Sequence, residues 1–377
     1  MGGEIKIGVL IPQSRQYKTL DRDFVRGLKL NNLNAKLFVE SIGIGADEQL
    51  IIEKIQKLSF QEGINIIIGF FGHNNISHVY EYASANDILV LATDLGATMP
   101  YSKKSFKGIY INSFALAESG YLLGKYFSEK NYNSIASATS YYDSGYGILS
   151  ALESSLTENI NFTGHYITPL NPREEEEKYM EAVIDNANPD AVFGFFSGLY
   201  AEETAAFISK NKITSKYPFY FTAFSISDAF IEDYKSNPIP AYIVSPWLES
   251  NDKSCEFTNQ YLAAYSQAPS IFSLLGYESG LIVNHIITKP EQAGNINSVI
   301  KIVEDIKIDG PRGTINFEDN KTLFDHYIYT LEANNNNDGL TFKKIETLSN
   351  NGDFIKKNEA IQIPERLGGW HNAYLCH

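Results

Sequence analysis

Short apolar runs alternate with amphipathic segments over the first two thirds of the chain. In the clearest unit, the runs 64–69 and 88–92 are largely apolar and flank an amphipathic segment. Strands that are apolar on both faces belong to parallel sheets that helices cover on each side. Each run leads into a loop of small and polar residues, and ligands bind beyond the carboxyl ends of such strands. The pattern therefore predicts the fold and also the loops where a ligand would lie.

The alternation occurs twice, which predicts two similar lobes. Leu20, Phe24 and Leu28 share one helical face, and a second helical pattern begins after Asp47, a favourable residue at a helix N-cap. Strands and helices that alternate with short loops are typical of a doubly wound α/β sheet. The expected strands are 5–11, 36–41, 64–68, 88–92 and 109–112 in the first series, and 135–139, 162–168, 191–196, 218–222 and 242–245 in the second.

After Trp247 the order of elements changes, because two helical segments follow each other without a strand between them. A hairpin is expected at 310–317, and the Asn-rich run 334–338 is interpreted as a turn between the last two strands. The expected helices are 174–186 and 201–210 before this point and 256–265, 274–288 and 296–306 after it, and the last expected strands are 327–331 and 342–345.

The composition is that of an ordinary globular protein, since 44% of the 377 residues are hydrophobic and 20% are charged. At about 150 residues per domain, this length predicts two domains. The net charge of -14 argues against a nucleic-acid or anionic-membrane partner, because phosphates attract a basic surface. The sequence contains no apolar run of about 18 residues, so it predicts no transmembrane helix. No signal peptide precedes the first strand, and we expect a native signal or lipoprotein anchor to have been removed before Met1.

The sequence contains none of the common catalytic or metal-binding motifs. The seven His residues lack metal-ligand spacing, and there is no Gly-x-Ser-x-Gly elbow or His-Glu-x-x-His helix. The loop 42–47 is similar to the start of a dinucleotide-binding loop but lacks its third Gly, so we expect a helix entry capped by Asp47. The acidic run 173–177 is expected to be a solvated helix start, since acids favour the positive end of a helix dipole. We therefore expect no metal, no cofactor and no enzymatic activity.

Five short segments together resemble one protein family. Two of them carry recognisable motifs: Ala92-Thr-Asp-Leu-Gly-Ala-Thr98 is close to a Ser-Pro-Gly-Ala-Thr pattern, and Asp309-Gly-Pro-Arg-Gly-Thr-Ile-Asn-Phe317 to a Gly-Pro-x-Gly-x-x-x-Phe hairpin. The other three are the strand 5–11, the strand and polar loop 68–75 and the segment 143–147. In this order and spacing they resemble the type I periplasmic binding proteins, in the branched-chain amino-acid branch that serves ABC importers.

This resemblance implies two Rossmann-like lobes between which the chain crosses three times. The crossovers, which act as hinges in the family, are expected near 112–115, 245–249 and 317–325. The first lobe would comprise residues 4–114 plus 250–320. The second would comprise residues 115–249 plus 321–377.

The resemblance also implies ligand contacts on the first lobe. His73, Asn74 and Asn75 match a loop that holds the ligand carboxylate in the family, and a helix start behind them would attract an anion. The alternative is that one Asn only caps the helix. Ala97 and Thr98 match residues whose backbone and hydroxyl bind the ligand, and the alternative there is a simple Gly-containing turn.

On the second lobe, Tyr146 matches an aromatic residue that closes over the ligand, and Leu199 or Tyr200 matches the next contact. Tyr17, after the first strand, completes the aromatic candidates. The alternative for each Tyr is a half-buried packing role, because Tyr commonly packs its ring and exposes its hydroxyl.

Phe224 is the main departure from the family pattern, because amino-acid binders place an acid there to pair with the ligand ammonium. A buried ammonium without a carboxylate partner is costly. Either Asp94, Asp143 or Asp228 replaces that acid, or the ligand is not an α-amino acid. Of these alternatives, we favour a small carboxylate with an apolar or aromatic body.

The expected function is that of an extracytoplasmic solute-binding protein, which traps a small carboxylate or amino-acid-like ligand and delivers it to the permease of an ABC importer. A ligand-sensing receptor domain of the same fold and an enzyme are the alternatives. We expect a monomer with no nucleic-acid partner. Cys255 and Cys376 would be able to pair in an oxidising compartment, and the alternative is two unpaired thiols.

Overall fold

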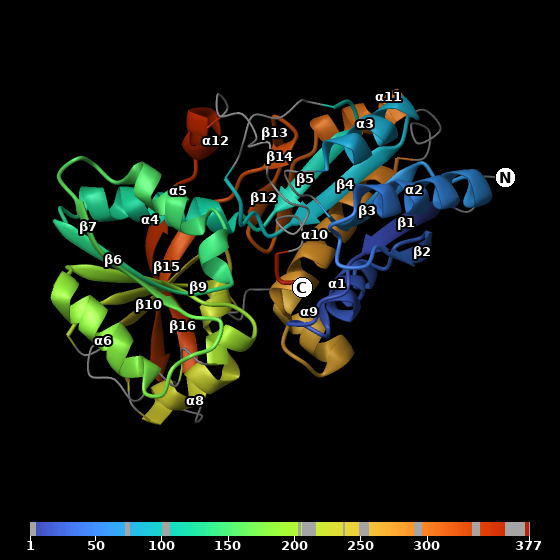
Figure 1. The fold of residues 1–377 in the computed structure, drawn as a ribbon. Helices are drawn as coiled ribbons and strands as arrows, with labels where there is room; N and C mark the ends of the chain where they lie inside the picture. Colours follow the sequence, from blue (N-terminus) through green and yellow to red (C-terminus); the bar gives the residue numbers. More distant parts are fainter. Residues whose placement is uncertain are drawn as a thin grey trace.

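A computed structural model describes residues 5–71, 76–99, 106–202, 205, 216–236, 238–248, 256–289, 296–333, 340–358 and 374–376. These residues form two α/β lobes that lie side by side, each built on a seven-stranded sheet (Figure 1). The expected fold class, two doubly wound lobes, is confirmed.

The first lobe is built on a sheet in the order β13-β14-β5-β4-β3-β1-β2, in which β13 alone runs antiparallel to its neighbour. Its strands are β1 (Lys6–Ile11), β2 (Lys36–Ser41), β3 (Ile66–Phe70), β4 (Leu89–Asp94), β5 (Ile109–Ser113), β13 (Phe317–Glu318) and β14 (Lys321–Thr322). Its helices are α1 (Leu20–Lys29), α2 (Glu48–Glu62), α3 (Ser77–Ala85), α9 (Glu256–Tyr265), α10 (Ile271–Ile287) and α11 (Ile296–Glu304), and the hairpin strands β11 (Ile308–Gly310) and β12 (Gly313–Ile315) follow α11.

Successive residues of the central strands serve two different core layers. Val9 belongs to the cluster that contains Phe24 of α1, whereas Leu10 belongs to the cluster that contains Ile51 of α2. This is the alternation that a strand covered on both faces requires. On the α1 side, α10 packs very closely, because a Cβ on Gly27 would lie 1.9 Å from the carbonyl oxygen of Ser273.

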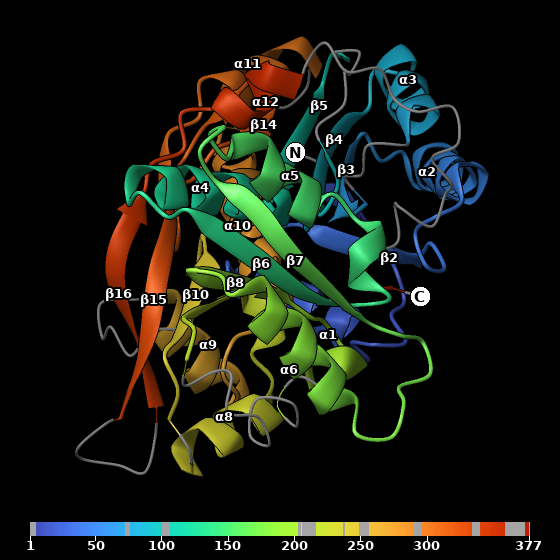
Figure 2. The same cartoon turned by 60° about the vertical axis from the view of Figure 1, so that its left-hand side comes forward.

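The second lobe is built on a sheet in the order β16-β15-β10-β9-β8-β6-β7, and its last two strands in sequence run antiparallel (Figure 2). Its strands are β6 (Ser134–Ser140), β7 (Asn161–Thr168), β8 (Ala191–Phe195), β9 (Phe219–Thr222), β10 (Ala241–Ser245), β15 (His326–Ala333) and β16 (Leu340–Leu348). Its helices are α4 (Leu116–Glu129), α5 (Ile148–Ser155), α6 (Glu176–Ala187), α8 (Asp228–Ser236) and α12 (Asp353–Asn358), with short 3-10 turns η1 (Asp143–Gly145) and η3 (Ala223–Ser225).

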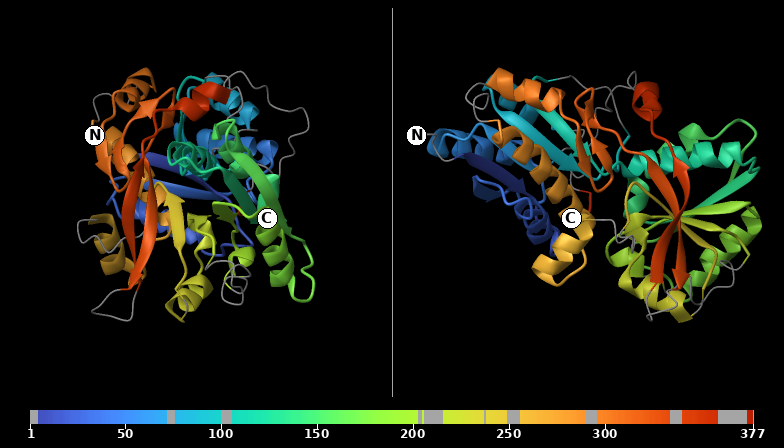
Figure 3. Two further views of the ribbon diagram at one scale, coloured as in Figure 1. Left: turned by 90° about the vertical axis from the view of Figure 1, so that its left-hand side faces the viewer. Right: turned by 180° about the vertical axis from the view of Figure 1, so that it is seen from behind.

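The chain crosses between the two sheets three times, as expected. It leaves the first sheet after β5, returns after β10, and leaves again between β14 and β15 (Figure 3). The division of the chain into lobes at residues 114, 249 and 320 stays a prediction. β14, which begins one residue after the last of these positions, pairs with β5 of the first sheet.

One local expectation is wrong. The acidic run at the start of α6 is not wholly solvated, because the Glu176 side chain is buried and accepts hydrogen bonds from the Tyr166 hydroxyl at 2.7 Å and from Arg173 Nε at 3.0 Å. These donors, first of all the Arg173 guanidinium, lower the pKa of Glu176 to about 2. Tyr166 lies on β7, so only the packing of α6 against that strand reveals this partner.

Most other expected elements agree with the structure to within a few residues. The expected helix 201–210 and the expected turn 334–338 fall largely or wholly outside the described residues, as does Cys255. Cys376 carries a free, buried thiol, which favours the unpaired alternative for the cysteines. Within the described part of the chain, no helix has the length and apolar character needed to cross a membrane.

Candidate functional site

Loops that follow the carboxyl ends of both sheets meet between the lobes. The Gly147 amide, after β6, donates to the Ala97 carbonyl, after β4, at 2.9 Å. The Gly198 amide, after β8, donates to the hydroxyl of Tyr17, after β1, at 2.9 Å. These bonds join the first lobe to the second, so the structure is a closed form.

An inter-lobe aromatic cluster lies behind these bonds, formed by Tyr17, Phe114, Phe224 and Phe272. The ring of Phe224 has its centre 5.6 Å from that of Tyr17, 6.1 Å from that of Phe114 and 6.0 Å from that of Phe272. Phe224 is 7% exposed, on η3 after β9. Burial raises the pKa of Tyr17 well above its usual value, so this hydroxyl stays neutral. Phe224 therefore presents an apolar surface at the position where the resemblance led us to expect an acid in amino-acid binders.

Three tyrosines form a second cluster on the second lobe. Tyr142 stacks on Tyr200 with ring centres 6.2 Å apart, and the Tyr146 hydroxyl donates to the Tyr142 hydroxyl at 3.4 Å. Leu199, by contrast, is 66% exposed. Of the two alternatives for this position, Tyr200 lies in the cluster and Leu199 does not.

A buried carboxylate lies beneath the tyrosines. Asp143 accepts hydrogen bonds from the hydroxyls of Ser140 at 2.6 Å and Ser197 at 2.7 Å, and from the Ser197 amide at 3.0 Å. The Tyr374 hydroxyl donates to it at 2.8 Å. Burial raises the pKa of Asp143, although these donors act in the opposite direction. Asp143 is thus an acceptor for neutral donors deep between the lobes.

Residues 374–376, here called the tail segment, occupy the space between the lobes. Leu375 is fully buried and donates its amide to the Tyr142 hydroxyl at 2.7 Å. The first lobe contributes two bonds: the Ser14 hydroxyl donates to the Leu375 carbonyl, and the Arg15 amide donates to the Cys376 carbonyl at 3.3 Å. Figure 1 shows the end of the chain between the two lobes. The tail segment therefore contacts both walls of the expected ligand site.

A buried ion pair lies where the crossovers meet. The Arg312 guanidinium bonds to both carboxylate oxygens of Glu278 on α10, at 2.9 and 2.5 Å. It also donates to the Ser113 carbonyl at 2.7 Å and to Asn112 Oδ1 at 2.8 Å, both at the end of β5. Its centre lies 4.0 Å from that of the Phe324 ring, between β14 and β15. Arg312 thus ties the first and third crossovers to the first lobe.

The expected carboxylate loop, His73, Asn74 and Asn75, lies outside the described residues. The helix behind it is present as α3, with Ile76 in the N-cap position. Glu48 already binds this helix start, because its carboxylate accepts from the His78 amide at 3.1 Å and lies 2.8 Å from the His78 ring nitrogen.

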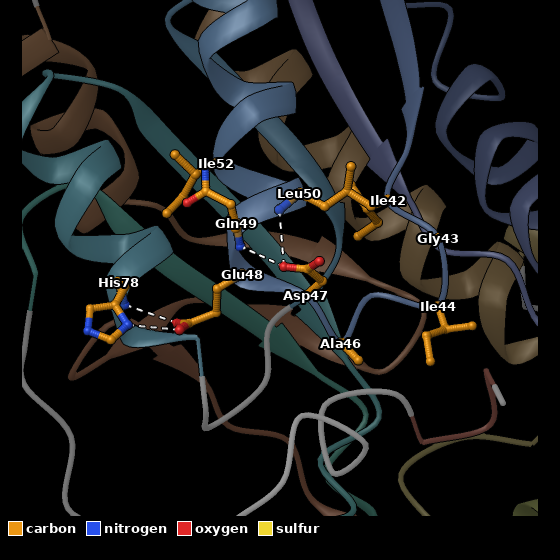
Figure 4. Close-up of a pocket in the computed structure, with 10 residues that line it drawn as sticks. All are labelled: Ile42, Gly43, Ile44, Ala46, Asp47, Glu48, Gln49, Leu50, Ile52 and His78. Atoms are coloured by element: carbon orange, nitrogen blue, oxygen red, sulfur yellow. Dashed lines mark hydrogen bonds and ion pairs between the residues drawn. The ribbon is translucent and has the colours of Figure 1, made fainter.

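An open hollow of about 800 Å³ lies beside this helix start and is lined by Ile42, Gly43, Ile44, Ala46, Asp47, Glu48, Gln49, Leu50, Ile52 and His78 (Figure 4). Asp47 caps α2, as expected, by accepting from the Gln49 amide at 2.9 Å and the Leu50 amide at 3.3 Å. Among the residues that the structure describes, no three His, Cys, Asp or Glu side chains are grouped as metal ligands would be.

The structure therefore gathers Tyr17, Ala97, Tyr146, Tyr200 and Phe224 around the inter-lobe space. Thr98 is partly buried next to this contact, since a Cβ on Gly147 would lie 2.9 Å from the Thr98 carbonyl carbon. Sequence analysis missed three residues with prominent positions here, namely Tyr142, Arg312 and Tyr374. Of these three, only Arg312 was marked by the sequence as a candidate, because it is a charged residue inside the Gly-Pro-Arg-Gly turn.

Solved structures share this architecture at low sequence identity. A Rhodopseudomonas palustris solute-binding protein in complex with benzoate has a TM-score of 0.70 and 17% identity, covering 92% of this chain and 97% of its own. Another from R. palustris, in complex with 4-hydroxybenzoate, has a TM-score of 0.71 and 18% identity, with coverage of 92% and 97%. A Streptococcus pneumoniae substrate-binding protein of a branched-chain amino-acid transporter, in complex with isoleucine, has a TM-score of 0.65 and 16% identity, with coverage of 91% and 100%.

A comparison with curated proteins finds no match. The family described as periplasmic binding protein, in contrast, matches residues 4–339, which is most of the chain. The two lobes and the three crossovers agree with this match. The chain belongs to the periplasmic binding protein family.

Proposed function

We propose that this chain is an extracytoplasmic solute-binding protein, which encloses a small organic ligand between its lobes and presents it to the membrane permease of an ABC importer. It acts as a monomer and does not transform its ligand. The observation that carries the proposal is the meeting of loops from the carboxyl ends of both sheets over buried aromatic and carboxylate groups. In open α/β sheets, ligands bind at this end of the strands.

The ligand class follows from Phe224 and its surroundings. An aromatic or alkyl body gains about 25 cal/mol for each Å² of apolar surface that the inter-lobe aromatic cluster removes from water. An ammonium group in the same place would lose its hydration without a carboxylate partner. We therefore favour a small carboxylate with an aromatic or apolar body, which is the class that benzoate and 4-hydroxybenzoate represent.

A plain amino acid is the alternative ligand, and Asp143 is the acid that would support it. Asp143 lies between the lobes, whereas Asp228 is exposed at the start of α8. An ammonium would have to replace a neutral donor on the Asp143 carboxylate. An ionised carboxylate binds a charged donor more strongly than a neutral one, so isoleucine belongs in any test.

Titration calorimetry with benzoate, 4-hydroxybenzoate and isoleucine tests the ligand class. We expect an aromatic acid to bind, and Phe224→Glu to weaken it by about tenfold or more, which corresponds to about 1.4 kcal/mol. Phe60→Glu is the matched control, because Phe60 is 77% exposed on α2. Binding of isoleucine or leucine at micromolar levels by the unchanged protein would show that another acid has taken over the role of the missing carboxylate.

A further inference from the structure

The side chains of Tyr142, Asp143 and Tyr146 hold a phenol group, that of Tyr374. The ring of Tyr374 stacks on Tyr142 with 12° between the ring planes and meets the edge of Tyr146 with ring centres 4.4 Å apart. Its hydroxyl reaches the Asp143 carboxylate at 2.8 Å. Aromatic walls recognise the ring, and a buried acceptor recognises the hydroxyl.

The protonation states of these groups suit this bond. Burial raises the pKa of Tyr374 well above its usual value, so the hydroxyl keeps its proton and is a donor. Asp143 accepts from the Ser140 hydroxyl on one carboxylate oxygen, and from both the Ser197 and the Tyr374 hydroxyls on the other. A ring without a hydroxyl would leave this oxygen with the Ser197 hydroxyl as its donor and would lose the second hydrogen bond, which is worth about 1 kcal/mol or more for a buried acceptor.

The tail segment is held in this place by its contacts. Leu375 has a φ of 65°, a backbone conformation that residues other than Gly rarely adopt. The Ser14 hydroxyl and the Arg15 amide donate to the carbonyls of Leu375 and Cys376, and the Leu375 amide donates to the Tyr142 hydroxyl, so both lobes hold this strained residue. A specific set of partners, rather than the preference of the local sequence, thus determines the conformation.

We propose that the pocket formed by Tyr142, Asp143 and Tyr146 is a phenol-binding subsite, and that Tyr374 fills it until a free hydroxyaryl ligand displaces the tail segment. This inference rests on the proposed function, because it assigns a ligand group to the same inter-lobe space. It adds an internal competitor and a preference for a hydroxyl on the ligand ring.

Competition lowers the apparent affinity for any external ligand. If the tail segment leaves the pocket open for about 1% of the time, the apparent dissociation constant rises about 100-fold. Removing the competitor should therefore strengthen binding. A ligand with a phenolic hydroxyl should benefit most, because it restores the bond to Asp143.

The first experiment compares Tyr374→Phe and Tyr374→Ala with the unchanged protein, using 4-hydroxybenzoate and benzoate as probes in titration calorimetry. We expect the unchanged protein to bind 4-hydroxybenzoate most weakly, Tyr374→Phe more tightly, and Tyr374→Ala most tightly. For Tyr374→Ala, the affinity should exceed that of the unchanged protein by about tenfold or more. In Tyr374→Ala, 4-hydroxybenzoate should bind about tenfold more tightly than benzoate. Tyr141→Ala is the matched control, because Tyr141 is 57% exposed on the same loop as the pocket.

The second experiment measures the tail segment without relying on ligand affinity. The chain has two cysteines, so Cys376 is the one thiol left in a Cys255→Ser background. Its side chain is 1% exposed, so a thiol reagent should label it slowly. In this background, Tyr374→Ala should accelerate the labelling of Cys376 about tenfold or more. In the protein that keeps Tyr374, saturating 4-hydroxybenzoate should also accelerate the labelling of Cys376, because it displaces the tail segment.

Three results would overturn the inference. One is a labelling rate of Cys376 that Tyr374→Ala leaves unchanged. Another is binding of 4-hydroxybenzoate that is equal in the presence and absence of the Tyr374 side chain, which would leave the proposed function intact. The third is the absence of 4-hydroxybenzoate binding in every variant. If isoleucine or benzoate then still binds, only the phenol subsite is rejected, whereas failure of all three probes counts against the proposed ligand class as well.

Discussion

At the residue scale, the change expected to affect stability most is the loss of Arg312, a charged side chain that has no access to water. The side chains of Arg312 and Glu278 are fully buried, and the guanidinium bonds to both carboxylate oxygens. The desolvation of two such charges consumes much of their attraction, so the pair does little for stability in absolute terms. Removing one partner is different, because the other is left buried without compensation.

Arg312→Met should therefore destabilise the protein by about 3–5 kcal/mol in urea unfolding followed by circular dichroism. Lys343→Met is the control, since it breaks the exposed pair with Glu332 and should cost about 0–1 kcal/mol. The double change Arg312→Met with Glu278→Met should recover part of the loss. Equal midpoints for Arg312→Met and Lys343→Met would contradict a structural role for the buried pair.

His326 predicts a pH dependence of stability. It is fully buried on β15, with its ring bonded to the Ser119 hydroxyl at 2.8 Å, and burial lowers its pKa to about 4. Glu118 attracts a proton to the ring, while Arg312 and Lys321 oppose it. In the unfolded chain, His326 binds a proton below a pH of about 6.5. In the folded chain, it does so only near pH of about 4. The stability from neutral His326 is complete above about 6.5 and is lost as the pH falls toward 4, by roughly 3 kcal/mol.

Melting curves of the unchanged protein and of His326→Gln between pH 7 and pH 4 check this expectation, as the gap between the two should narrow toward acid. The comparison of slopes removes the shared effect of Asp143, which is present in both proteins. His78→Gln serves as control, because that imidazole is exposed. Parallel profiles for the unchanged protein and His326→Gln would rule out His326 as the source of the acid sensitivity.

At the element scale, the approach of the β6 loop to the β4 loop limits closure. Gly147 has φ -77° and ψ 4°, which other residues adopt without strain, so its lack of a side chain matters for space alone. A Cβ at this position would lie 2.5 Å from the backbone nitrogen of Met99 on the opposite lobe. Closure of the lobes therefore requires glycine at this contact.

Gly147→Ala should weaken ligand binding about tenfold or more, because an extra methyl group at a tight contact costs about 1–3 kcal/mol in the closed form. The open form would be unaffected, so melting without ligand should change less than affinity does. Ser144→Ala, on the same loop, removes a hydroxyl bonded to the Tyr141 carbonyl and should leave affinity unchanged. Calorimetry with 4-hydroxybenzoate measures both variants. An affinity of Gly147→Ala equal to that of Ser144→Ala would show that closure tolerates the methyl group.

At the scale of the whole molecule, the tail segment connects the two lobes. Its bonds to Ser14 and Arg15 on one side and to Tyr142 and Asp143 on the other are cross-lobe contacts of the kind that ligand closure provides. A compact chain of this length has a radius of gyration of about 21 Å. The protein with its tail segment in place should be near this value even without ligand.

Small-angle X-ray scattering tests this coupling. Tyr374→Ala without ligand should have a larger radius of gyration than the unchanged protein, and 4-hydroxybenzoate should reduce it, because hinge opening separates the lobes. Tyr141→Ala should behave like the unchanged protein. Identical radii for all variants with and without ligand would mean that the lobes do not move relative to each other.

The sequence by itself determined the order of elements, because strand and helix patterns depend on neighbours that are close along the chain. The run 88–92 gave the position of β4, and Asp47 gave the start of α2. The departure at Phe224 was also visible in the sequence, and the structure places that ring between the lobes. The alternation of two strand series was enough to predict two lobes.

Only the tertiary structure decided which distant residues meet. Tyr374 and Asp143 are separated by 231 positions, and Arg312 lies 199 positions from Ser113. No periodicity relates such residues, because their contact depends on how the lobes close and where the chain crosses between them. The same reason explains why the sequence did not distinguish Leu199 from Tyr200: adjacent residues point in different directions, and only the packing of Tyr142, 58 positions earlier in the chain, shows which of the two is enclosed.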